Sequence, residues 1–167
     1  MKPKARPADV AHTGLPDAAL ADVVLPDVAL LDVNVLLALF DPMHLHHALI
    51  RHWFAEGVSR IATCPLTELG FVRIASHPRY PNPMDTPAQA LGLLRALHAD
   101  ARHEFWPDAL SLVDAGFEQH PFQSHKETTD RYLLRLAMHQ RGRLLTMDIG
   151  IKPADDAERA TLCLLVA

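Results

Sequence analysis

Short apolar runs and longer amphipathic stretches follow one another along most of the chain. The apolar runs predict buried strands, at residues 28–31, 61–64, 103–106, 143–147 and 161–166. Apolar residues at helical spacing predict helices, at residues 35–40, 44–57, 65–76, 88–101 and 128–140. The weakest pattern covers residues 108–124, where a short helix is predicted at residues 109–113. Strands that alternate with helices predict a three-layer α/β/α fold, with a mainly parallel sheet of about five strands.

The length of 167 residues fits one domain with a sizeable core. Residues 1–26 are rich in Pro, Ala and Asp and lack a sustained period, which predicts a loosely ordered N-terminal extension. The folded domain is therefore expected at residues 27–167. Residues 15–23 nearly repeat residues 25–33, so that Asp22 mirrors Asp32, but only the second copy continues into a long apolar helix.

The composition is that of an ordinary globular protein, with 49% hydrophobic and 22% charged residues. No apolar run reaches membrane-spanning length and no secretory signal is evident, so we expect a cytoplasmic protein without a membrane partner. Cys64 and Cys163 lie in apolar contexts, as buried free thiols do in a reducing compartment. The formal net charge of -4 neither indicates nor excludes a nucleic-acid ligand, because charge can be segregated on one face.

The stretch around Asp32 places a carboxylate where a buried strand gives way to a buried helix. Asp and Asn are preferred helix N-caps, so capping by Asp32 or Asn34 is one explanation of this pattern. The other explanation is functional, because open α/β sheets bind ligands outside the carboxyl ends of their strands.

Three further acids occupy equivalent positions. Glu68 and Asp130 lie near the starts of predicted helices and share a face with apolar residues, whereas Asp148 follows a predicted strand. Each has a structural explanation, either as a first-turn acid that complements the helix dipole or as a turn former. Taken together with Asp32, they are expected to converge, because a parallel sheet brings the carboxyl ends of its strands to one edge.

Clustered carboxylates repel one another, and without a cation some of them are protonated near neutral pH. Hard oxygen ligands predict Mg²⁺ or Mn²⁺ as the cofactor. Such an ion lowers the pKa of a bound water and stabilises charge on a phosphoryl oxygen. The chain has no phosphate-binding glycine loop and no nucleophile elbow. A histidine metal site is not expected, although the chain has 11 histidines.

The sequence blocks that carry these acids resemble those of the PIN-domain ribonucleases, in particular the VapC-type toxins of bacterial toxin–antitoxin pairs. LLDVNVLLALF is similar to the first block of the family, CPLTELGFVRIASHP to the second, and TTDRYLLRLAMHQRGRLLTMD to the third and fourth. The resemblance covers about residues 28–166. It maps the family's catalytic, metal-binding acids onto Asp32, Glu68, Asp130 and Asp148, with Asn34 and Thr146 as supporting polar residues.

The resemblance implies a metal-dependent endoribonuclease that forms a homodimer and is silenced by a cognate antitoxin. Two features depart from the family pattern. Residues 1–26 have no counterpart in typical members, and Ile149 follows the final acid where a basic residue is common. The second departure predicts that one substrate contact of the family is missing here.

The partners of such an enzyme lead to two further predictions. The cations nearest to the acids in sequence are candidate RNA phosphate contacts: Arg73, Lys126 and Arg131. Four apolar residues are candidates for an antitoxin groove, with burial in the core as the alternative explanation: Leu36, Leu39, Phe40 and Trp53.

Two alternatives to a toxin ribonuclease stay open. A receiver-like phosphoacceptor module also gathers acids and Mg²⁺ at strand ends, but Lys152 here follows an acid almost directly, unlike the lysine of a receiver. A free-standing or degenerate PIN domain is the second alternative, and the presence of all four acids argues against the degenerate form.

Overall fold

The computed structural model describes residues 28–56, 60–113 and 115–165. Its centre is a five-stranded, all-parallel sheet with the strand order β3-β2-β1-β4-β5, which confirms the predicted sheet. The strands are β1 (Val28–Leu31), β2 (Arg60–Thr63), β3 (His103–Phe105), β4 (Arg143–Thr146) and β5 (Leu162–Leu164).

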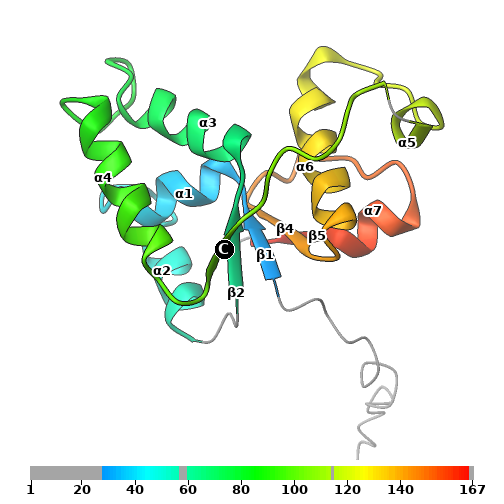
Figure 1. Cartoon of the computed structure of the whole chain (residues 1–167). Coiled ribbons are helices and arrows are strands. Elements are labelled where there is room, and N and C mark those ends of the chain that lie inside the picture. Colours follow the sequence, from blue (N-terminus) through cyan, green and yellow to red (C-terminus); the bar gives the residue numbers. More distant parts are fainter. Residues whose placement is uncertain (1–27, 57–59, 114, 166–167) are drawn as a thin grey trace, which may run out of the picture.

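Helices cover both faces of the sheet, so the fold has the three predicted layers (Figure 1). One face carries α1 (Val33–Phe40), α2 (His47–Ala55), α3 (Pro65–Ala75) and α4 (Pro87–His98). The other carries α5 (Ala115–Glu118), α6 (Thr128–His139) and α7 (Asp156–Thr161). A 3₁₀ turn, η1 (His125–Glu127), leads directly into α6.

Successive residues of the central strands belong to two separate cores. Leu31 and Leu145 pack with the α1–α4 layer, whereas Leu30 and Leu144 pack with α6. This alternation follows from the two-residue period of a strand, and it explains why consecutive residues in the middle of β1 and β4 are apolar. All four leucines are fully buried.

The α1 helix is part of the first core, which corrects one prediction. The exposed fractions of Leu36 and Leu39 are 0% and 5%, so neither lines an antitoxin groove. Phe40 and Trp53 are only partly buried and pack against the same core. The alternative explanation, burial in the core, therefore holds for the two leucines.

The structure differs from the predicted elements in the weakly patterned segment. Residues 109–113 are not helical, and the chain there lies against α6, where Leu110 packs on the second core and its carbonyl accepts a hydrogen bond from the Tyr132 hydroxyl at 3.5 Å. The α7 helix was not predicted because it has no apolar stripe. Its buried residues are Glu158 and Thr161.

Two predictions concern the ends and the surroundings of the chain. The proposed extension, residues 1–26, lies outside the described residues. Within the part of the chain that the structure describes, no helix is both long and apolar enough to cross a membrane.

The strand order locates a ligand site. The strand β1 has β2 on one side and β4 on the other, and the connections that lead to these neighbours cross opposite faces of the sheet. Such a reversal leaves a crevice at the carboxyl ends of the two strands, where open α/β sheets bind ligands. Asp32 and Asp148 follow these two strand ends.

Candidate active site

Asp32 connects the end of β1 to α1 and caps this helix, whereas its functional role stays a prediction. Its Oδ1 atom accepts a hydrogen bond from the Val33 amide at 2.6 Å, which caps the helix. Its Oδ2 atom accepts hydrogen bonds from Thr146 Oγ1 at 2.6 Å and Asn34 Nδ2 at 2.8 Å. Burial raises the pKa of Asp32, although these hydrogen bonds oppose the shift.

Thr146, at the end of β4, links the loops that follow the two central strands. Its hydroxyl donates to Asp32 and accepts from Asn34 Nδ2 at 2.9 Å and from the Asp148 amide at 3.1 Å. Asn34 Oδ1 in turn accepts from the Met147 amide at 3.1 Å. These contacts restrict the orientation of the Asp32 carboxylate, and a supporting role of Thr146 and Asn34 in catalysis stays a prediction.

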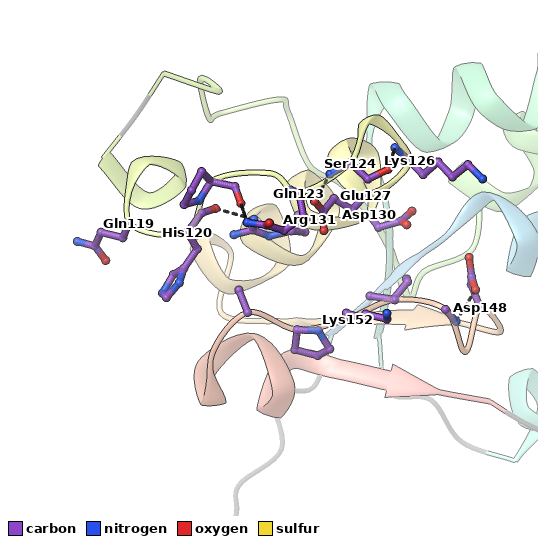
Figure 2. A pocket seen from close by; sticks show the side chains of 15 residues that line it. Gln119, His120, Gln123, Ser124, Lys126, Glu127, Asp130, Arg131, Asp148 and Lys152 are labelled. Atoms are coloured by element: carbon purple, nitrogen blue, oxygen red, sulfur yellow. Dashed lines mark hydrogen bonds between the residues drawn. The ribbon is translucent and has the colours of Figure 1, made fainter.

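Asp130 and Asp148 lie at the same end of a pocket, one on the first turn of α6 and the other on the loop after β4 (Figure 2). Burial, followed by the negative charges of Asp32, Asp148 and Glu127, raises the pKa of Asp130 to about 6. Asp148 is exposed, and its Oδ1 accepts a hydrogen bond from the Gly150 amide at 2.7 Å. Three of the four predicted acids therefore interact with one another.

Glu68 has a different set of neighbours. Although it lies in the first turn of α3, its carboxylate accepts a hydrogen bond from the Thr63 hydroxyl at 2.6 Å and lies 2.6 Å from His98 Nε2. Both partners lie on the side of β2 and β3. A role for Glu68 beside the other three acids stays a prediction.

The donor set of the acid cluster fits a hard divalent cation. Asp32, Asp130 and Asp148 offer only carboxylate oxygens, the ligands that Mg²⁺ and Mn²⁺ prefer. Burial is the main cause of the raised pKa of Asp130, and the neighbouring carboxylates add to it; a bound cation would offset their charge.

A pocket of about 740 Å³ extends from the acids along α6. Lys126, on η1, and Lys152, after β4, line it, and both side chains are exposed (Figure 2). Arg73 is also exposed, on the last turn of α3. The pocket therefore joins a negative end to flanking positive charges.

Arg131, predicted as an RNA contact, is 3% exposed. Its guanidinium donates to the His120 carbonyl at 2.6 Å and lies 3.5 Å from the Glu158 carboxylate, which is fully buried on α7. Arg135 pairs with the same carboxylate at 2.7 Å. In this structure the charge of Arg131 is engaged inside the protein, so its RNA contact stays a prediction with weaker support than that of Lys126.

Four residues at these sites were not identified from the sequence: Thr63, His98, His103 and Glu127. Glu127 adds negative charge next to Asp130, and its position three residues before that acid was a usable signal. The two histidines are five positions apart and join Glu68 only through the packing of α4 and β3 against α3 and β2.

Comparison with known proteins identifies the family. Ribonuclease VapC39 of Mycobacterium tuberculosis is 43% identical over 127 residues, which cover 75% of this chain and 90% of that protein. Ribonuclease VapC44 of the same organism is 45% identical over 122 residues, which cover 71% of this chain and 84% of the relative. Ribonuclease VapC38 is 44% identical over 120 residues with the same coverage. No model of a known protein family matches the chain.

The chain belongs to the VapC family of ribonucleases. Family membership confirms the resemblance seen in the four sequence blocks. It also replaces the receiver-like alternative, because the relatives carry the name of a nuclease rather than that of a signalling module.

The raised pKa of Asp130 predicts a pH dependence of stability in the metal-free protein. Because the folded-state pKa of about 6 exceeds the ordinary value of 3.8, the folded state holds the proton more tightly. Stability is therefore lost as pH rises from about 4 to about 6. Asp130→Asn should be more stable than the parent at neutral pH by on the order of 1 kcal/mol, after allowance for solvent screening. The difference should vanish near pH 4.

Urea unfolding in the presence of a chelator, at neutral pH and near pH 4, measures the stability difference between the variant and the parent at each pH. Asp156→Asn, at a fully exposed position on α7, is the matched control and should show no such pH-dependent difference. A metal-free Asp130→Asn variant that is less stable than the parent at neutral pH would contradict the raised pKa of Asp130.

Proposed function

We propose that the protein is a Mg²⁺- or Mn²⁺-dependent endoribonuclease that hydrolyses phosphodiester bonds at the acid cluster. The observation that carries the proposal is the convergence of Asp32, Asp130 and Asp148 at the reversal point of the sheet, with the pKa of Asp130 raised to about 6. The names of its relatives support RNA as the substrate.

In this proposal Asp32, Asp130 and Asp148 hold the cation. When bound, the cation supplies an activated water and neutralises charge on the phosphoryl oxygen. Thr146 and Asn34 keep the Asp32 carboxylate in one orientation, because both donate to its Oδ2 atom. Glu68 completes the site, directly or through water, and orients the attacking water once it separates from His98.

The pocket beside the acids is the proposed path of the RNA backbone. Lys126 and Lys152 line this pocket, whereas Arg73 is exposed on the last turn of α3 and does not line it. Phosphate contacts position a nucleic acid without reading its sequence, so these residues contribute affinity rather than specificity.

The proposed partners are those of a toxin: a second copy of the chain and a cognate antitoxin. In this proposal the antitoxin blocks the acid cluster, either with a positively charged side chain or with an apolar helix that covers the cluster. The negative charge that raises the pKa of Asp130 favours the first route, since an Arg or Lys side chain pairs with carboxylates.

The nuclease proposal predicts that Asp148→Asn abolishes cleavage. The substitution removes a ligand charge, but its remaining side-chain oxygen still accepts from the Gly150 amide, so the turn is kept. We expect at least a hundredfold loss of Mn²⁺-dependent cleavage of a fluorescent RNA, with a thermal unfolding midpoint of the metal-free protein no lower than that of the parent. The loss is of the size found when electrostatic stabilisation at a site is removed.

Asp156→Asn and Asp22→Asn are the controls for this experiment. The first lies on an exposed surface, and the second changes the near-repeat of the Asp32 motif. Cleavage by Asp148→Asn at the parent rate would contradict the assignment.

The proposed RNA path predicts which positively charged side chains contribute to RNA binding. Lys126→Ala, Lys152→Ala and Arg73→Ala should each weaken RNA binding and lower the slope of log affinity against log salt by about 1. Binding is measured with the cleavage-deficient Asp148→Asn background at several salt concentrations. Arg95→Ala, exposed on α4, should leave both quantities unchanged.

Arg131 is unsuitable for the same test, because removal of one partner of a buried ion pair costs about 3–5 kcal/mol in stability. If Lys126→Ala and Lys152→Ala leave the salt slope intact, the RNA does not follow this pocket.

The toxin role predicts that expression of the chain arrests growth and that the product of the adjacent upstream open reading frame relieves the arrest and co-purifies with it. Asp148→Asn should not arrest growth but should still co-purify. A product that neither binds nor relieves the arrest would leave a free-standing nuclease as the better description.

A further inference from the structure

Glu68, His98 and His103 form a second group of potential ligands beside the acid cluster. One ligand atom from each residue can be chosen so that all three lie within 4.8 Å of one another. A search of the described residues for three or more His, Cys, Asp or Glu side chains within this distance of one another finds this group alone. The sequence pattern does not predict it, because distant elements bring the residues together.

The protein scaffold holds both imidazoles in place. His98 ends α4, and His103 starts β3, where it pairs with Ile61 of β2. The rings stack with their centroids 4.1 Å apart and their planes inclined by 26°. In the connecting turn, Asp100 accepts hydrogen bonds from the Arg102 side chain at 2.8 and 3.0 Å.

Arg102 also fastens this turn to the α2 helix. Its guanidinium donates to the Phe54 carbonyl at 3.0 Å and lies over the Phe54 ring at 4.3 Å. The positions of the two histidines therefore depend on contacts of the turn itself and not on a bound ligand. Pre-positioned imidazoles lower the entropic cost of binding an ion.

The nitrogen atoms that face Glu68 are the ones suited to ligation. His98 Nε2 lies 2.6 Å from Glu68 Oε1, and His103 Nε2 lies 2.8 Å from the Thr63 hydroxyl, which itself donates to Glu68 Oε1. Metal–ligand bonds of about 2.0–2.1 Å place two tetrahedral ligands roughly 3.3 Å apart. Glu68 and His98 thus need to separate by less than about 1 Å.

Solvent access to the group and the neutral state of the His103 imidazole also favour the binding of an ion. The side chains of His98 and Glu68 are 39% and 22% exposed, so solvent reaches the group. Burial, and the neighbouring His98, lower the pKa of His103, which keeps its imidazole neutral at neutral pH, as ligation requires. The fully buried Thr63 hydroxyl supplies an outer contact to the ligand set.

We propose that Glu68, His98 and His103 bind a divalent transition-metal ion such as Zn²⁺ or Co²⁺, at a site distinct from the three-acid cluster. Two imidazole nitrogens select such ions over Mg²⁺, which prefers oxygen ligands. A consequence rests on the proposed function: an ion bound here retains Glu68 on the β2–β3 side and withholds it from the acid cluster. Transition metal then inhibits the nuclease.

Binding is tested first, without reference to activity. The full-length protein, saturated with Mg²⁺, is titrated with Co²⁺ while visible absorption and calorimetric heat are followed. A ligand set with two imidazoles is expected to give d–d absorption stronger than that of Co²⁺ in an all-oxygen site. His98→Gln and His103→Gln should each weaken this Co²⁺ affinity at least about tenfold.

Two histidine variants are matched controls. His139→Gln changes an exposed residue at the end of α6, and His46→Gln changes the histidine-rich turn before α2. Neither should alter the titration. His98 is an exposed helix-end residue, so His98→Gln keeps the test valid even if His103→Gln fails to fold, which circular dichroism reveals.

The Asp148→Asn variant separates this site from the proposed nuclease site. It should lose cleavage but keep the Co²⁺ spectrum and affinity. Unchanged Co²⁺ binding in both His98→Gln and His103→Gln, or loss of binding in His46→Gln alone, would overturn the site. Loss of the spectrum in Asp148→Asn would instead place Co²⁺ in the acid cluster.

Inhibition is tested separately, with Zn²⁺ added at saturating Mg²⁺. The parent and His139→Gln should lose activity, whereas His103→Gln should need at least about tenfold more Zn²⁺ for the same loss. Equal sensitivity of the three proteins would refute the inhibitory consequence and leave the metal site intact. A parent without nuclease activity would refute the proposed function alone.

Discussion

The hydrogen bond from Thr146 to Asp32 joins the carboxyl ends of β1 and β4, and the arrangement of the acid cluster depends on it. It is short, at 2.6 Å, and buried, and the acceptor is a carboxylate. The same hydroxyl accepts from the Asp148 amide, so one side chain sets the position of two acids. This geometry requires neighbouring parallel strands that end at the same level, which the β1–β4 register provides.

The third acid of the cluster is placed by a different interaction. Asp130 lies on α6, and α6 is held against α7 by the buried pairs of Arg131 and Arg135 with Glu158. Removal of one partner from such a pair is costly, so the helix has little freedom to move away from the repulsive cluster. The fold therefore tolerates a carboxylate with a raised pKa because the buried contacts of Arg131 and Arg135 on the same helix oppose its displacement.

Glu68 stands between two sets of partners. Its backbone belongs to the edge of the sheet that carries the other acids, but its carboxylate contacts Thr63 and His98. A single carboxylate cannot neutralise ions at both places at full strength. The position of this one side chain thus connects the chemistry of the oxygen-only cluster with that of the histidine pair.

The sequence by itself determined the parallel three-layer fold and the residues that end its central strands, because strand and helix periodicity and helix-start signals are local properties. It also singled out four acids, two after strands (Asp32 and Asp148) and two near helix starts (Glu68 and Asp130), because both patterns are visible without a structure. Only the tertiary structure decided that Glu68 contacts His98 and that Arg131 is buried, because side-chain direction depends on which helices pack together. The α7 helix also depends on tertiary structure, because its buried face carries the charged residue Glu158, whose partners lie on α6.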